Sequence, residues 1–195
     1  VKKNVKTIKT VPEFYQKIQV CLQEAPVNGK CFKFSQRTGE GTIDQWDVSK
    51  ITDMRNAFVN REQFNGDLSN WNTTAVTSMQ GMFKGAKRFN SPLTYWITTN
   101  VKDMDRMFDG AWEFDQPLNF LDTRNVKYMN YMFRDTFMFN QDINELGELF
   151  KNKNIFPSLG DAGAHVSQFI DAGWSTFVLS HWLRDKQIYS VGEGI

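Results

Sequence analysis

Two histidines and two cysteines are the strongest metal ligands and nucleophiles in this chain of 195 residues. A structural zinc site needs about four such ligands close together. Cys21, Cys31 and His165 are too scattered to form such a set. His181 lies among apolar residues, where a neutral imidazole could be the axial ligand of a pigment or metal, but no second ligand accompanies it. We therefore expect no metal and no cofactor.

Paired carboxylates are the other groups with catalytic potential, since general acid–base chemistry uses them. Asp44 with Asp47, and Asp103 with Asp105, are such pairs. Both recur at turns of a repeat, which favours solvated or capping roles. The sequence contains no Gly-x-Ser-x-Gly motif, no cysteine with a credible histidine partner and no phosphate-binding loop. We expect no catalytic residue and a protein that is not an enzyme.

A period of 25 residues organises the middle of the chain. A phenylalanine opens each unit, an aliphatic residue follows at the fifth position and a bulky residue at the eighth. In the second half of each unit, an aliphatic residue, a methionine, a second methionine (Ala57 in the first unit) and a phenylalanine recur at fixed spacing. The predicted structural columns are Phe64, Phe89, Phe114 and Phe139, then Trp46, Trp71 and Trp96, then Met54, Met79, Met104 and Met129.

Such a period lies within the range of leucine-rich-repeat-like solenoids, whose units each supply a short strand and a helical or turn segment. Val101, Met104, Met107 and Phe108 have the i, i+3, i+6, i+7 spacing of a short helix. The Leu-x-x-Trp stretch is the predicted strand. We expect an α/β fold, a short right-handed leucine-rich-repeat-like solenoid of about four to five rungs with helical N- and C-terminal caps.

A polar column follows the repeat phenylalanines. Asn65, Asn90 and Asn140, with Asp115 in the equivalent place, occupy one turn position. Side chains of this kind can bond the backbone of neighbouring rungs, and an unpaired buried group costs about 1–3 kcal/mol. We interpret the column as an internal hydrogen-bond ladder.

The segment FNGDLSNWNTTAVTSMQGMF, from Phe64 to Phe83, resembles the repeat of the BspA-like surface protein family, a leucine-rich-repeat relative. The segment from Trp46 to Met54 is similar to the family's first unit, and the resemblance covers about residues 29–145. It implies binding and adhesion at surfaces and offers no catalytic residue to carry over. The pattern has drifted at Ile97 and at 120–122, which favours one fixed partner over a long adhesive array.

Three regions follow from these patterns: residues 1–38 as an N-terminal capping helix and turn, 39–149 as the repeat solenoid, and 150–195 as a C-terminal extension with an amphipathic helix. The N-terminal helix begins with the capping box at Thr10–Glu13 and continues to about Glu24. Its buried side is Val11, Phe14, Ile18, Cys21 and Leu22.

The C-terminal helix, from His165 to about Arg184, has an apolar arc wider than one core contact needs. Two interpretations stay open: the helix seals the last rung, or one of its sides meets a partner protein or a membrane interface. The candidate partner-binding residues are Phe169, Trp174, Phe177, His181 and Trp182.

Composition limits the partners. Lys and Arg number 23 against 22 Asp and Glu, a net charge of +1, so we expect no nucleic acid partner. The sequence contains no run of about 18 uncharged apolar residues, so it predicts no transmembrane helix. The first methionine is Met54, so we expect that a signal or transit peptide has been removed before Val1. An organelle is favoured over secretion or the cell surface.

The predicted function is a non-enzymatic protein–protein interaction module. The favoured form is a structural or assembly-stabilising subunit of a larger complex, such as an organellar membrane complex. The alternative is a secreted or cell-surface adhesin that binds a host or matrix protein. A Cys21–Cys31 disulfide, or a glycan on the Asn72–Thr74 sequon, would favour the alternative. Sequence alone leaves the pairing of the two cysteines open.

Overall fold

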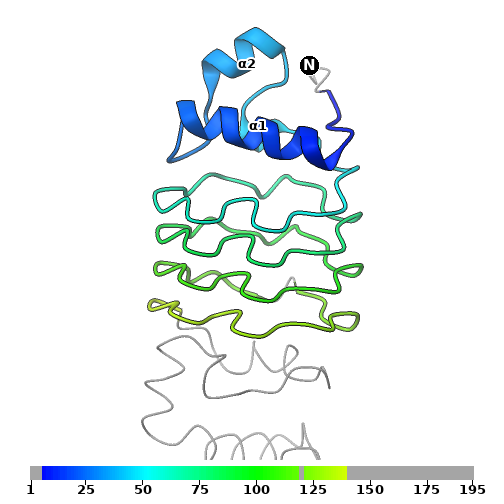
Figure 1. Cartoon of the computed structure of the whole chain (residues 1–195), viewed down its shortest axis with the longest axis vertical. Helices are drawn as coiled ribbons and strands as arrows, with labels where there is room; N and C mark the ends of the chain where they lie inside the picture. The colour runs from blue at the N-terminus through cyan, green and yellow to red at the C-terminus, as the bar shows by residue number, and fades with distance from the viewer. Residues whose placement is uncertain (1–5, 119–120, 140–195) are drawn as a thin grey trace, which may run out of the picture.

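The computed structural model of the protein describes residues 6–118 and 121–139. Two helices come first, α1 (Val11–Glu24) and α2 (Phe32–Thr38), followed by the 3-10 helix η1 (Ile43–Gln45). From there the chain winds into stacked rungs that lie below α1 and α2 in Figure 1. We number the rungs 1 (51–75), 2 (76–100), 3 (101–125) and 4 (126–139, its described part).

The prediction of an α/β leucine-rich-repeat solenoid is wrong for the described residues, which contain two α-helices, one 3-10 helix and no β-strand. The stretch from Val101 to Phe108, predicted as a short helix, consists of turns. The β-bridges between the described rungs are isolated and parallel, such as those of Ser78 with Asp53 and with Asp103. The predicted C-terminal helical cap lies outside the described residues.

The physical reason for the error is that consecutive turns imitate helical spacing. The N–H of Met107 donates to the carbonyl of Met104 at 3.2 Å, a bond between residues three apart, and the equivalent bond recurs in the neighbouring rungs. Arg106, between them, has φ of 56°, in the left-handed region that a continuing α-helix or strand does not contain. The apolar residues therefore recur every third position, as in a helix, although none forms.

Backbone hydrogen bonds between rungs replace the strands. In residues 54–60, 79–85 and 104–110, every second N–H donates to a carbonyl of the rung below, at 2.7–3.0 Å, while intervening N–H groups, such as that of Met82, close turns within their own rung. Between rungs 2 and 3 these bonds run from Met79 to Asp103, Gly81 to Asp105, Phe83 to Met107 and Gly85 to Asp109.

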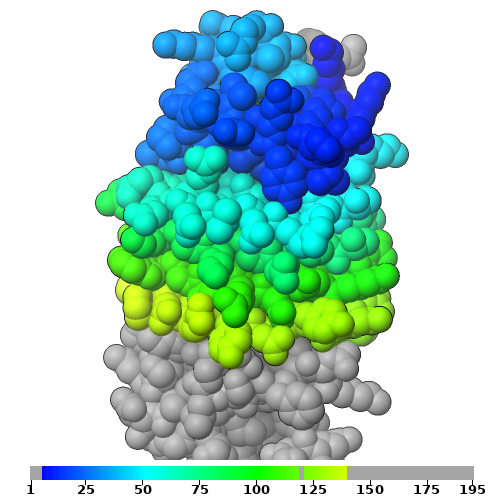
Figure 2. All heavy atoms as spheres, viewed as in Figure 1, coloured from blue at the N-terminus to red at the C-terminus, as the bar shows by residue number. Residues whose placement is uncertain are grey.

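The interior is a double ladder of phenylalanines. Phe83 and Phe89 stack at 3.8 Å within rung 2, and each stacks on its counterpart in rung 3, Phe108 at 5.6 Å and Phe114 at 6.1 Å. The same geometry links all four rungs, and atoms of successive rungs abut in Figure 2. Every residue of the predicted Phe, Trp and Met columns is buried. Offset stacking of this kind adds about 0.5–1.5 kcal/mol per pair beyond area burial.

Two polar ladders run beside the aromatic one. Two bonds confirm the predicted ladder. The backbone N–H of Asn90 donates to the side-chain oxygen of Asn65, and the backbone N–H of Asp115 donates to the side-chain oxygen of Asn90, both at 2.9 Å. Asn140 lies outside the described residues. A second ladder uses buried threonines: the hydroxyl of Thr98 donates to the carbonyl of Asp122 at 3.2 Å and accepts from its N–H at 2.7 Å.

Helix α1 covers rung 1. It begins where the capping box predicts, with the Thr10 hydroxyl accepting from the N–H of Glu13 at 3.3 Å, and it ends at Glu24. Phe14 meets the edge of the Trp71 ring at 5.6 Å, and the Tyr15 hydroxyl donates to the carbonyl of Arg55. Burial of Tyr15 raises the pKa of its hydroxyl to about 12. The apolar end of the stack is thereby closed.

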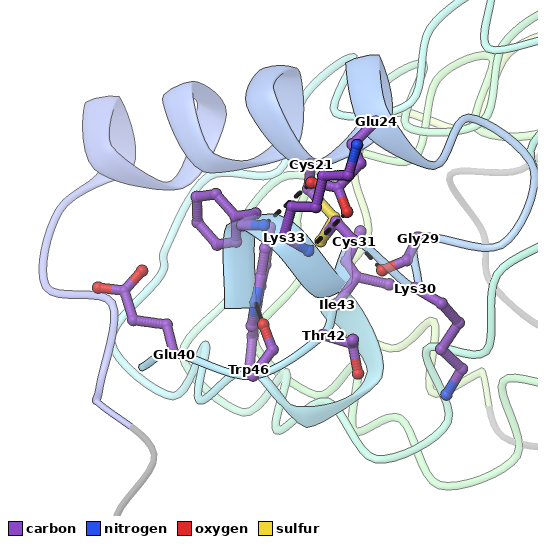
Figure 3. The surroundings of a disulfide bond; sticks show 12 residues. Cys21, Glu24, Gly29, Lys30, Cys31, Lys33, Glu40, Thr42, Ile43 and Trp46 are labelled. Carbon is purple, nitrogen blue, oxygen red and sulfur yellow. Dashed lines mark hydrogen bonds between the residues drawn. A yellow bond between two sulfur atoms is a disulfide. The ribbon is translucent and has the colours of Figure 1, made fainter. Parts of the chain in front are cut away.

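A disulfide fixes this cap (Figure 3). Cys21 of α1 and Cys31, just before α2, are bonded to each other, and both are fully buried. The Glu24 carboxylate accepts from the N–H groups of Lys33 and Phe34 at 2.8 and 2.9 Å, which satisfies the start of α2. The two helices are thus joined both covalently and by a helix cap.

We expect Asn90→Ala to lower the free energy of unfolding by about 1–2 kcal/mol, because it leaves the N–H of Asp115 and the side-chain amide of Gln116 without their shared acceptor. Urea denaturation of the full chain measures the effect. Asn70→Ala is the matched control, since the Asn70 side chain makes no hydrogen bond with a described residue. Equal losses in the two variants would contradict the ladder.

Removing the disulfide should lower the free energy of unfolding by about 2–3 kcal/mol, because the bond closes a loop between residues 10 apart in sequence. The measurement compares urea denaturation with and without a reductant. The Cys21→Ala/Cys31→Ala variant should have the same free energy of unfolding as the reduced protein, and the reductant should not change it. Identical unfolding midpoints for the oxidised and reduced wild type would show that the crosslink does not stabilise the cap.

Candidate functional site

The residues predicted to bind a partner, Phe169, Trp174, Phe177, His181 and Trp182, lie outside the described residues. Binding through the C-terminal helix, pigment or metal ligation by His181, and peripheral membrane contact therefore stay predictions. Within 6–118 and 121–139, no helix is long and apolar enough to cross a membrane.

The carboxylate pairs serve as turn caps. Asp103 accepts from the N–H of Asp105 at 3.0 Å, and burial raises the pKa of the Asp103 carboxyl. Asp44 forms an ion pair with Lys30 at 2.8 Å, and Asp47 accepts from the N–H of Ser49. In the part of the chain that the structure describes, no three His, Cys, Asp or Glu side chains gather as metal ligands.

Large apolar side chains are exposed on rungs 3 and 4. Scattered exposed apolar residues are ordinary on a soluble protein, whereas a group of them marks an interaction surface. Tyr95 and Ile97 of rung 2, and Val27 and Phe32 of the cap, are exposed at separate places in the chain. The residues of rungs 3 and 4 are Trp112, Tyr128, Tyr131, Phe137 and Met138.

One chain of contacts on this surface runs down a single column of the repeat. The ammonium group of Lys87 forms an ion pair with Glu62 in the rung above, at 2.9 Å, and lies 4.5 Å from the centre of the Trp112 ring in the rung below. The Trp112 ring in turn contacts Phe137 at 5.7 Å. Trp112 is thus held between its neighbours while 43% of its surface stays exposed.

A second cluster surrounds Tyr131. The guanidinium groups of Arg106 and Arg134 each lie 5.2 Å from the centre of the Tyr131 ring. Arg134 also donates two hydrogen bonds, at 2.8 and 2.7 Å, to the Asp109 carboxylate, which is buried and lies 3.7 Å from Lys84. The bonds to Asp109 raise the pKa of the Arg134 guanidinium, so its charge is permanent.

These two clusters form what we call the aromatic–cation surface. Tyr131 and Phe137 are six residues apart, so the clusters lie within about 22 Å of each other. A typical interface covers about 800 Å² on each partner, which spans such a distance. Trp, Tyr and Arg are also the residues that dominate binding energy at interfaces. The surface comprises Lys87, Arg106, Trp112, Tyr131, Arg134 and Phe137.

Sequence analysis selects no face of the rungs as a binding surface. The contacts above bring Lys87 to Trp112, and they bring Arg106 and Arg134 to Tyr131. A signal for this surface is present in the repeat. The column that holds Glu62 and Lys87 in the earlier units turns aromatic in the later ones, at Trp112 and Phe137.

A family model described as "Mycoplasma protein of unknown function, DUF285" matches residues 29–146. The match begins between α1 and α2 and includes all the described rungs. No curated protein and no solved structure matches the chain.

Proposed function

The chain belongs to this DUF285 family, whose function is unknown, and from its own surface we propose a non-enzymatic module that binds a protein partner. The proposed setting is outside the reducing cytosol, either secreted or at the cell surface, which is the alternative that sequence analysis gives. The aromatic–cation surface is the observation that carries the proposal. Its aromatic rings are half-exposed but fixed by neighbouring charges, so binding orders few side chains and little conformational entropy is lost.

The charge pattern favours a protein over a polyanion. All four cations of these two clusters are already engaged: Lys87 with Glu62, and Lys84 and Arg134 with Asp109, while Arg106 lies over Tyr131. A net charge of +1 provides no long-range attraction for nucleic acid. A partner with an apolar centre and acceptor groups at its rim fits this arrangement.

The disulfide supports a location outside the reducing cytosol. Disulfides form and persist in oxidising environments and are rare in the cytosol. The Cys21–Cys31 bond lies wholly inside the cap, where both cysteines are fully buried. Kinship with BspA-like surface proteins, which we propose from the repeat sequence, agrees with this setting. The organellar-complex hypothesis depends on the C-terminal helix, which lies outside the described residues.

A photo-crosslinking residue at Met138, beside the surface and 58% exposed, should form one discrete adduct with the partner when the full chain is placed in its source cells. Mass spectrometry identifies the adduct. Adding Trp112→Ala should reduce its yield at least tenfold, because truncation of a central interface aromatic costs about 2 kcal/mol or more. Tyr95→Ala, which removes an exposed aromatic from rung 2, is the control. An adduct that persists without Trp112, or the absence of any adduct, would refute the proposed surface.

The compartment has a separate test. A membrane-impermeant amine reagent should label the protein on intact source cells or in their medium, because lysines such as Lys87 are accessible. Thiol blocking under denaturing conditions should find both cysteines unreactive until a reductant is added. Labelling only after lysis, together with two free thiols, would exclude secretion and the cell surface.

A further inference from the structure

A hollow of about 330 Å³ opens between rungs 1 and 2, away from the columns of the aromatic–cation surface. Ser69, Asn70, Asn72 and Thr74 line it from rung 1, and Tyr95 and Ile97 line it from rung 2. Its volume lies at the lower end of the range of small-molecule sites, about 300–1,000 Å³. The hollow therefore suits a single compact ligand.

The lining contains no charged residue. A phosphate or carboxylate ligand needs a cation or a set of charge-assisted donors, and a cationic ligand needs a carboxylate or an aromatic cage. On the neighbouring rung 3, Asp122 and Arg124 form an ion pair with each other. These features point to a ligand that is electrically neutral.

The hollow is polar on one side and apolar on the other. Asn72 accepts the N–H of Thr74 at 3.1 Å, so its NH₂ group remains a donor, and Asn70 makes no side-chain hydrogen bond with a described residue. Facing them, Tyr95 is 77% exposed and Ile97 is 47% exposed. Side-chain amides offer both donors and acceptors, and a tyrosine ring offers a flat face of partial negative charge.

The rungs hold the two sides in place. The Thr73 hydroxyl, next to Asn72 in the sequence, donates to the carbonyl of Ile97 and accepts from its N–H, both at 2.9 Å. Trp71 and Trp96, next to Asn70 and Tyr95, stack at 6.5 Å inside the core. The backbone of the polar and apolar walls is therefore fixed before a ligand arrives, which lowers the entropy cost of binding.

We propose that this hollow binds one neutral sugar unit of a glycan. Sugar hydroxyls donate and accept like the amides of Asn70 and Asn72, and the C–H face of the ring packs on Tyr95. A neutral peptide matches less well, because it needs a continuous edge for its extended backbone, whereas the hollow is confined to short segments of two rungs. This site does not depend on the protein partner proposed above.

The test is an NMR titration of the ¹⁵N-labelled full chain with methyl glycosides of glucose, galactose, mannose, N-acetylglucosamine and N-acetylgalactosamine. We expect at least one glycoside to give saturable amide shifts at residues 69–74 and 95–97. Tyr95→Ala should raise its Kd about tenfold and Asn70→Ala about fivefold. Trp112→Ala, on the other surface, should leave the Kd unchanged. An unchanged unfolding midpoint for Tyr95→Ala excludes a folding defect.

Three results would overturn the sugar site. The first is the absence of saturable shifts with every glycoside of the panel. The second is an unchanged Kd in Tyr95→Ala. The third is a neutral capped tripeptide that shifts residues 69–74 while the glycosides do not. A lost protein adduct with retained glycoside binding, or the reverse, separates this site from the aromatic–cation surface.

Discussion

The alternation of backbone hydrogen bonds is the constraint on which the rest of the molecule depends. In residues 54–60, and in the equivalent segments of rungs 2 and 3, every second N–H reaches a carbonyl of the rung below, so successive rungs must lie in register. The register requires left-handed residues at equivalent places in each unit. One such column contains Asn56, Gly81, Arg106 and Tyr131, with φ of 56° or 57°. A unit of different length would leave these groups unpaired, which explains the strict period.

This register separates the residue columns that must repeat in every unit from those that can vary between units. Inward columns must repeat, because Phe83 has to stack on Phe108 and Trp71 on Trp96. Outward columns need only keep the backbone conformation. A column can therefore change from carboxylate to ammonium to aromatic ring between rungs without disturbing the stack, as Glu62, Lys87 and Trp112 do. Departures from the repeat on the outside are where function is to be sought in such a protein.

The same separation explains how much could be predicted from the sequence. Buried columns, the asparagine ladder and α1 were predictable, because each has a period or a cap that its residue types reveal. Strands and short helices were wrongly predicted, because turns that bond Met107 to Met104 produce the i, i+3 spacing of a helix. The hollow was not predictable, and the aromatic–cation surface had one signal, the column that turns aromatic at Trp112 and Phe137, because contacts between rungs decide which exposed residues meet.

The position of the disulfide follows from the mechanics of a stack. Each rung contacts only its neighbours, so a terminal rung is stabilised from one side unless a cap covers it. Phe14 of α1 packs against Trp71 of rung 1. The N–H of Asn65 in rung 1 donates to the carbonyl of Val27, which lies between the two cysteines in sequence. The Cys21–Cys31 bond therefore restrains the segment that satisfies rung 1. Because rung 1 in turn pairs with rung 2, a covalent bond within the cap limits fraying of the two rungs that line the hollow.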